Sequence, residues 1–206
     1  MSDPQTVFIV DDDNAVLDSL GVLLESLGFR VELFESGASF LAALDENANG
    51  CLILDVRMPG LSGLEIQERL TDRNATLPVI IMTGHGDLPM AVKAMKAGAV
   101  DFVEKPFDAD GIAASVNMAM ARSAENIQEA TQVADINQRL ARLTTRERQV
   151  LDELVVGNLN KVIAYNLDIS PRTVEIHRAR TMEKMQARNL AHLVRLALTV
   201  GATPME

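Results

Sequence analysis

The first half of the chain alternates short apolar runs with segments whose apolar residues recur at helical spacing. The run at 51–54 does not alternate with polar residues, which is typical of a strand buried on both faces, although a buried helical turn has the same pattern over so few residues. We expect strands at 6–10, 30–34, 51–54, 77–82 and 99–103. The intervening segments predict helices, and strands that alternate with helices predict a parallel sheet covered on both faces.

The second half of the chain has only helical patterns. Apolar spacing and breaks in it predict helices at about 144–157, 160–167, 171–186 and 189–200. Ser170 is suited to cap the third of these and Pro171 to begin it. Two short helices, a tight turn and a third helix resemble a helix-turn-helix module.

The segment between the halves, from Asp108 to Leu143, has one glycine and no proline. Within it Val133, Ile136, Leu140 and Leu143 recur at 3-4-3 spacing. We therefore expect the last helix of the first half to continue into a helical linker, with a flexible linker as the alternative. The predicted domains are 1–124 and 143–206, joined by the helical linker 125–142.

Composition favours a protein of the reducing cytoplasm. No apolar run approaches membrane-spanning length, no signal segment opens the chain, and the single cysteine excludes an internal disulfide. The net charge of −10 argues against nucleic acid for the chain taken whole. The charge is uneven, however, because residues up to Arg122 hold 8 of the 19 basic and 19 of the 29 acidic residues. The two halves are therefore expected to have different partners.

Polar side chains stand at the ends of four predicted strands, namely Asp11 with Asp12, then Asp55, Thr83 and Lys105. Parallel strands deliver their carboxyl ends to one edge of a sheet, where α/β proteins bind ligands. Three carboxylates at one point repel one another unless a cation joins them, and oxygen ligands favour Mg²⁺. A carboxylate can attack phosphorus, and a lysine, a metal and a hydroxyl can stabilise the product. Taken alone, Asp55 is equally well explained as a strand-end turn residue.

These motifs, with Met58-Pro59-Gly60 after Asp55 and Pro106 after Lys105, resemble the receiver domain of two-component response regulators. The resemblance implies a flavodoxin-like (βα)5 fold with a five-stranded parallel sheet, and a cis peptide at Lys105-Pro106. It assigns Asp55 as phosphoacceptor, Thr83 and Lys105 as phosphoryl contacts, and Phe102 as a switch residue. It also implies a Mg²⁺ site, whose ligands would be Asp11, Asp12, Asp55 and the main-chain carbonyl of Arg57.

Three neighbouring residues carry weaker predictions. Asp13 is expected to cap the following helix rather than bind metal. His85 is predicted either to tune the access of water to the phosphoryl group or to be an exposed loop histidine. Cys51 is expected to be a small buried hydrophobic residue.

The third helix of the second half sorts into two faces. Val174, Arg178, Thr181 and Met185 share one stripe, and Arg172, Glu175, Ile176 and Ala179 lie opposite. The segment 171–196 has six basic and two acidic residues, which suits nucleic acid, although a solvated face of a protein-binding helix is the alternative.

From Leu143 onward the chain resembles the LuxR-type effector domain of FixJ/NarL-type regulators, an all-α four-helix helix-turn-helix domain. The stretch Met82–Asp87 is most similar to FixJ-type regulators. The resemblance implies that Glu175, Ile176 and Ala179 face base edges, with Arg172 beside them, and that Lys161, Thr173 and Arg180 contact phosphates. Val162, Tyr165 and Asn166 depart from the charged residues usual in this family, and Thr181 from an aliphatic one.

The combined prediction is a transcription factor that is not an enzyme. A sensor histidine kinase would phosphorylate Asp55 with Mg²⁺, and a homodimer formed through the fourth helix and fifth strand, around Met90, Val92 and Lys96, would bind duplex DNA. RNA polymerase is a further candidate partner, and no membrane contact is expected. The alternatives are a Mg²⁺-dependent phosphotransferase or phosphatase, which Arg57 in place of a second carboxylate disfavours, and a protein-interaction switch without DNA binding.

Overall fold

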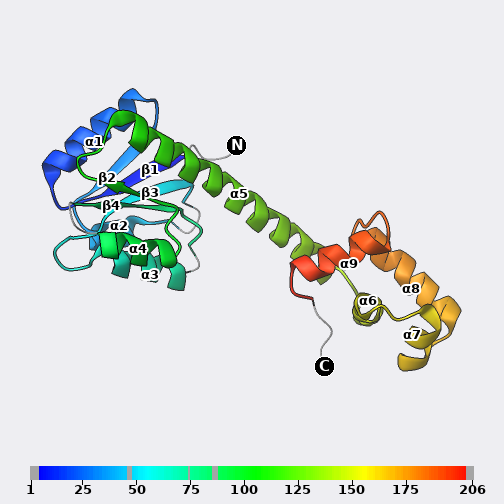
Figure 1. Ribbon diagram of the computed structural model, residues 1–206. Coiled ribbons are helices and arrows are strands. Elements are labelled where there is room, and N and C mark those ends of the chain that lie inside the picture. Colours follow the sequence, from blue (N-terminus) through cyan, green and yellow to red (C-terminus); the bar gives the residue numbers. More distant parts are fainter. Residues whose placement is uncertain (1–4, 46–47, 74, 85–87, 203–206) are drawn as a thin grey trace. The chain divides into compact units, whose positions relative to one another are not determined.

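The computed structural model describes residues 5–45, 48–73, 75–84 and 88–202 of the 206-residue chain (Figure 1). Its described strands form one parallel five-stranded sheet in the order β2-β1-β3-β4-β5. They are β1 (Thr6–Val10), β2 (Arg30–Phe34), β3 (Gly50–Asp55), β4 (Val79–Thr83) and β5 (Asp101–Glu104). The predicted receiver fold is confirmed, and Asp55 and Thr83 are the last residues of their strands.

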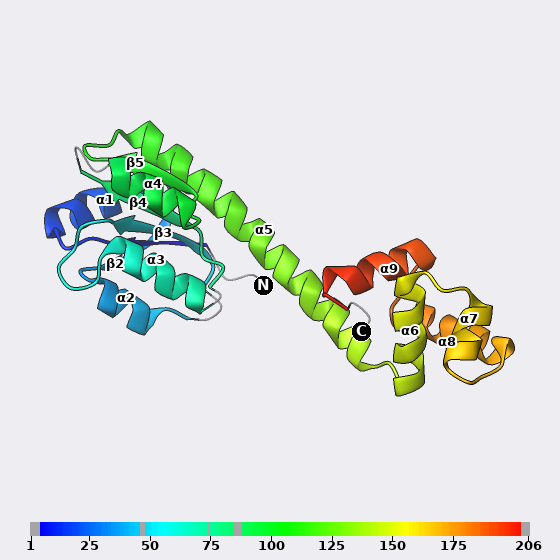
Figure 2. The same ribbon diagram turned by 60° about the horizontal axis from the view of Figure 1, so that its bottom comes forward.

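Helices cover both faces of the sheet, as Figures 1 and 2 show. On one face, α1 (Asn14–Ser26) and the start of α5 pack leucine, isoleucine and valine side chains against Ile9, Ile53 and Ile80. On the other face, α2 (Gly37–Ala43), α3 (Gly63–Asp72) and α4 (Leu88–Lys96) pack against Leu52, Leu54 and Ile81. All six residues of β3 are buried, which explains its unbroken apolar pattern.

Helix ends in this half follow local capping chemistry. Asp13 accepts a hydrogen bond from the amide of Ala15 and caps α1, as predicted. Ser36 caps α2, and Ser62 forms a capping box with Glu65 at the start of α3. The strand predicted at 77–82 begins two residues later, at Val79, and the one predicted at 99–103 begins at Asp101.

A single helix, α5 (Ala109–Ala141), spans the segment between the halves. Its first turns bury Ile112, Val116 and Ala119 in the core of the sheet unit. Its last turns bury Ile136 and Leu140 in a separate core with the helices that follow. The chain is thus helical from Ala109 to Ala141, and the apolar spacing at Ile136 and Leu140 reflects burial in the core of the second unit.

The second unit contains α6 (Thr145–Val156), α7 (Asn160–Asn166), α8 (Pro171–Lys184) and α9 (Leu190–Thr199) (Figure 2). Thr144 and Glu147 form a capping box, and Gly157 ends α6 at a φ of 93°. Pro171 starts α8 after its cap, Ser170, as predicted, but α8 ends at Lys184 rather than near Gln186.

The chain divides into two compact units, 1–127 and 128–206. None of the described helices is both long enough and apolar enough to cross a membrane.

Candidate functional site

Three charged side chains meet at the carboxyl edge of the sheet. The Lys105 Nζ atom donates hydrogen bonds to Asp11 Oδ2 at 2.5 Å and to Asp55 Oδ1 at 2.7 Å. The other two carboxylate oxygens accept main-chain hydrogen bonds, Asp55 Oδ2 from Arg57 at 2.7 Å and Asp11 Oδ1 from Asp13 at 2.9 Å. Every oxygen of this carboxylate pair therefore has a donor.

Burial and charge act in opposite directions at this site. Burial raises the pKa of the Asp55 carboxyl, more than the hydrogen bond and the charge of Lys105 lower it. Burial also disfavours the charged ammonium of Lys105, but its hydrogen bonds to Asp11 and Asp55 outweigh that effect and raise its pKa. The lysine is thus held as a cation between the two carboxylates.

An open pocket of about 320 Å³ lies over this cluster, lined by residues that include Asp12, Gly84 and Arg57. Asp12 is exposed, whereas Thr83, at the end of β4, is buried beneath the edge. No three His, Cys, Asp or Glu side chains of the described residues lie close enough to enclose a metal by themselves. Magnesium does not need such a cage, because one or two carboxylates, water and phosphate oxygens suffice. The carboxylates of Asp11 and Asp55, which already share the Lys105 cation, offer only oxygen atoms as ligands and therefore fit Mg²⁺.

Three further predictions concern residues near the site, namely the Lys105-Pro106 peptide, Cys51 and His85. The peptide between Lys105 and Pro106 is cis, as the receiver resemblance implied. Cys51 is fully buried, and burial raises the pKa of its thiol to about 12, so it remains an uncharged hydrophobic residue, as predicted. The predicted alternatives for His85 fall outside the described residues, as does the rest of the stretch from His85 to Asp87.

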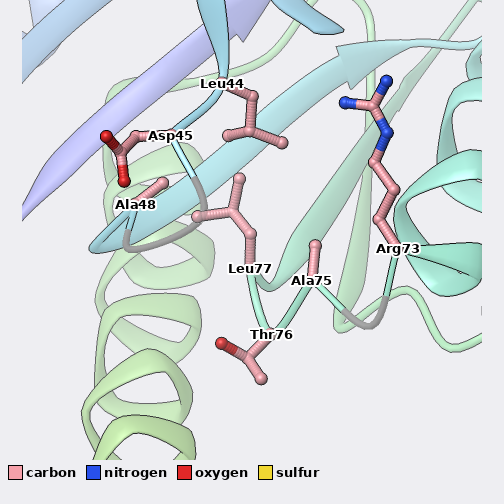
Figure 3. A pocket seen from close by; sticks show the side chains of 7 residues that line it. All are labelled: Leu44, Asp45, Ala48, Arg73, Ala75, Thr76 and Leu77. Carbon is pink, nitrogen blue, oxygen red and sulfur yellow. The ribbon is translucent and has the colours of Figure 1, made fainter.

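A second pocket lies at the opposite, amino-terminal edge of the sheet, among the residues that precede β3 and β4 (Figure 3). Leu44, Ala48 and Leu77 line it, and Asp45 and Arg73 stand on opposite sides of it. None of the predicted phosphoryl-transfer residues reaches this pocket, so it is not the site that the strand ends form.

The predicted switch and dimerisation residues lie on α4 and β5. The Phe102 side chain is 42% exposed, so it does not fill the core. Val92 is 47% exposed and Lys96 is also exposed, whereas Met90 is half-buried against the core. Met95, at 40% exposed, belongs to the same helix. This part of the receiver therefore presents apolar side chains to solvent.

The predicted DNA-reading face of α8 is on the surface. Glu175, Ile176 and Ala179 are exposed, and so are Arg172 and Arg180. Lys161 is exposed on α7. Thr173 is half-buried, and its hydroxyl lies 2.8 Å from that of the cap Ser170. The face therefore has two properties that the sequence predicted, exposure and positive charge.

The buried side of α8 includes residues whose role the sequence did not reveal. Lys184 Nζ donates to Glu147 Oε2 at 2.6 Å and to the carbonyl of Arg142 at 3.1 Å, which ties α8 to α6 and to the end of the linker. The Lys184 hydrogen bond is the main reason that the pKa of Glu147 falls to about 2. Thr181 is fully buried and donates to the carbonyl of Glu147 at 3.4 Å, so its hydroxyl has a partner. The sequence did not reveal the pair of Glu147 and Lys184, because no short-range signal links residues 37 positions apart.

Two family descriptions match the chain. Residues 7–117 match "Response regulator receiver domain", and residues 141–197 match "Bacterial regulatory proteins, luxR family". The two matches coincide with the parallel sheet and with the helical unit.

Curated relatives align with this chain over nearly their whole length. The chain is 50% identical to the transcriptional regulatory protein FixJ of Azorhizobium caulinodans over 206 residues, which is all of this chain and 98% of that protein. It is 49% identical to FixJ of Rhizobium meliloti over 97% of this chain and 98% of that protein. Among solved structures, it resembles the response regulator StyR with a TM-score of 0.80 at 42% identity, covering 95% of this chain and 98% of that one. Full-length FixJ from B. japonicum gives a TM-score of 0.60 at 47% identity, covering 96% and 98%.

Proposed function

Since the chain belongs to the FixJ-type response regulators, which are phosphorylation-dependent regulators of transcription, we propose that Asp55 is the residue that receives the phosphoryl group. The observation that carries this proposal is the convergence of Lys105 Nζ on Asp55 Oδ1 and Asp11 Oδ2 at the end of the central strand. A sensor histidine kinase is the partner that a receiver domain implies.

In the proposed reaction, a carboxylate oxygen of Asp55 attacks the phosphorus of a phosphohistidine. The new O–P bond forms as the N–P bond breaks, and the imidazole leaves with the electron pair and takes up a proton. Asp55 Oδ1 is the better placed nucleophile, because its partner is a flexible lysine side chain. Its other oxygen is held by the main chain of Arg57.

After the transfer, Lys105 is proposed to bind the phosphoryl group. Once Asp55 Oδ1 carries the phosphoryl group as an acyl phosphate, the ammonium can bind a phosphoryl oxygen, while the hydroxyl of Thr83 can donate to another. Asp11, Asp12, Asp55 and the carbonyl of Arg57 would hold a magnesium ion in the same pocket. When bound, the ion neutralises charge on the phosphoryl oxygens.

Movement of Thr83 and Lys105 toward the phosphoryl group would be transmitted to the adjoining helix and strand. The predicted response is dimerisation through α4 and β5, with Phe102 turning inward. Exposed apolar side chains on this face, Val92 and Phe102 among them, support this proposal, because a contact would bury them.

The output is DNA binding by α8 in the major groove. The groove admits one helix, Glu175 can accept a hydrogen bond from cytosine N4, and Ile176 and Ala179 can contact a thymine methyl. Lys161, Thr173 and Arg180 would contact phosphates, with Arg172 beside the base-reading residues. A dimer would engage two half-sites about one helical turn apart. RNA polymerase remains a proposed further partner.

The phosphoacceptor is tested by incubating the chain with acetyl phosphate and Mg²⁺ and measuring its intact mass. The wild type should gain one phosphoryl group, and Asp55→Asn should gain none. Asp13→Asn is the matched control, because Asp13 lines the same pocket but caps α1. Full labelling of Asp55→Asn would refute the assignment.

A further inference from the structure

Arg178 is the charged residue in the stripe that Val174, Arg178, Thr181 and Met185 form along α8 and its C-cap. Its stripe neighbours Val174, Thr181 and Met185 are fully buried. Arg178 itself is half-buried. A guanidinium beside an apolar core needs polar partners or solvent, so the groups that its head reaches are informative.

The Arg178 side chain lines a surface pocket of about 520 Å³ that α6, the loop before α7, and the starts of α7 and α9 form with α8. The polar part of the lining includes Asn158, Asn160 and Lys161, and the apolar part includes Leu159 and Leu190. Two cations from different helices thus face one cavity, beside the amide groups of two asparagines.

No acidic side chain lines this pocket, and none of the described carboxylates forms an ion pair with Lys161 or Arg178. The hydrogen bond of Arg178 to Asn160 Oδ1 is long, at 3.5 Å. In the same unit, Arg139, Arg148 and Lys184 each pair with a carboxylate.

The acidic side chain of Glu153 does not neutralise the pocket either. Its Oε2 atom accepts from Asn158 Nδ2 at 2.7 Å and from Asn166 Nδ2 at 3.0 Å. The pocket therefore has two positive charges without a bound negative one.

We propose that this pocket binds one phosphodiester of the DNA backbone, held by Arg178 together with Lys161 and Asn160. The inference rests on the proposed DNA-binding function and adds a site to it. A guanidinium can give two parallel hydrogen bonds to phosphate oxygens, and an ammonium adds a point charge. A phosphodiester also brings sugar carbons, which suit Leu159 and Leu190 at the apolar side. Arg178 thus anchors the DNA strand from the inward side of α8, while the outward side reads bases.

The test uses the full chain and a duplex selected from random sequences with the phosphorylated protein. Single backbone phosphates of that duplex are replaced, one at a time, by uncharged methylphosphonates. For the wild type, one position per half-site should weaken binding by about tenfold or more, as loss of a charge-assisted contact does. For Arg178→Gln, which keeps a side chain that can bond to Asn160, the same replacement should have little further effect.

Two further variants separate charge from geometry and from folding. Arg178→Lys should keep the salt dependence of binding but lose part of the position-specific effect, because an ammonium lacks the guanidinium fork. Arg195→Gln removes the same charge from the exposed face of α9 and should leave the sensitive position unchanged. Thermal unfolding of each variant must match the wild type.

The outcomes distinguish a failure of the pocket assignment from a failure of the proposed DNA-binding function. If Arg178→Gln, folded and binding DNA, responds to every methylphosphonate as the wild type does, the pocket does not bind a phosphodiester, although DNA binding stands. If no duplex can be selected with the phosphorylated wild type, the proposed function itself fails, and the pocket assignment fails with it.

Discussion

The receiver edge and the α8 surface both depend on basic side chains, but they hold them differently. At the receiver edge, Lys105 lies within 2.7 Å of two carboxylates and is partly buried. On the second unit, the described surface residues Lys161, Arg172 and Arg180 are exposed and have no described carboxylate within ion-pair distance. We call the first site closed, because Lys105 pairs with two carboxylates of the same chain. We call the second surface open, because no described carboxylate pairs with these basic side chains, and the negative partner that we propose for them is DNA.

Breaking the closed site should have the largest effect. Lys105→Ala removes the cation that Asp11 and Asp55 share, so a phosphoryl group on Asp55 would have no ammonium to draw toward it. We expect the variant to fold and to accept phosphate, but to remain monomeric where the phosphorylated wild type dimerises at micromolar concentration.

Sedimentation of phosphorylated samples measures this effect. Lys161→Ala, which removes a lysine from α7, should dimerise as the wild type does. A phosphorylated Lys105→Ala variant that dimerises normally would show that Lys105 does not transmit the signal.

The second unit also has one closed charge pair, and disrupting it should lower stability rather than function. Glu147→Gln weakens the bond to Lys184, and we expect the free energy of unfolding of this unit to fall by about 2 kcal/mol. Urea unfolding followed by circular dichroism and by the fluorescence of Tyr165, the only tyrosine in a chain without tryptophan, reports on this unit. Glu183→Gln, on the exposed side of α8, should stay within about 0.5 kcal/mol of the wild type.

The same pair predicts a pH dependence. The pKa of Glu147 falls from the ordinary 4.5 to about 2 in the folded state. A carboxyl whose pKa is lowered by folding stabilises the fold above its unfolded pKa, and this contribution is lost as pH falls from 4.5 toward 2. The stability difference between wild type and Glu147→Gln should therefore shrink over that interval, and a constant difference would contradict the pairing.

On the open surface, base reading should be sensitive at single positions. Glu175→Ala should cost about 1–3 kcal/mol at one base pair and relax the preference there, because the carboxylate no longer accepts from cytosine N4. Competition among duplexes that differ at one position measures it. Unchanged affinity and preference would show that the register of α8 in the groove is wrong.

The smallest expected effect is electrostatic and independent of sequence. Arg180→Ala should weaken binding to all duplexes alike and lower the slope of log affinity against log salt by about one. Glu183→Ala, a change of charge in the opposite sense on the same helix, should not lower the slope. A sequence-dependent loss in Arg180→Ala would mean that this arginine reads bases.

The sequence predicted the closed site better than the open one. Apolar runs that end in Asp11, Asp55, Thr83 and Lys105 indicate where each strand stops, and parallel pairing brings those ends together. The bonds of Lys105 to both carboxylates follow from that convergence.

Helix spacing on α8, in contrast, separates the two faces but does not show what an inward arginine touches. The role of Arg178 depends on the pocket that it reaches, and the Glu147–Lys184 pair depends on how α6 and α8 cross. Both are properties of tertiary packing between helices, and the local pattern does not contain them.

The central claim is that the phosphoryl group on Asp55 controls DNA binding by the other unit. The most direct measurement is the affinity of the full chain for its selected duplex with and without acetyl phosphate and Mg²⁺, in wild type and in Asp55→Asn. Phosphorylation should strengthen wild-type binding on the order of a hundredfold, because a dimer engages both half-sites, and should leave Asp55→Asn unchanged. Equal affinity of the phosphorylated and unphosphorylated wild type, or an equal gain in Asp55→Asn, would contradict the claim.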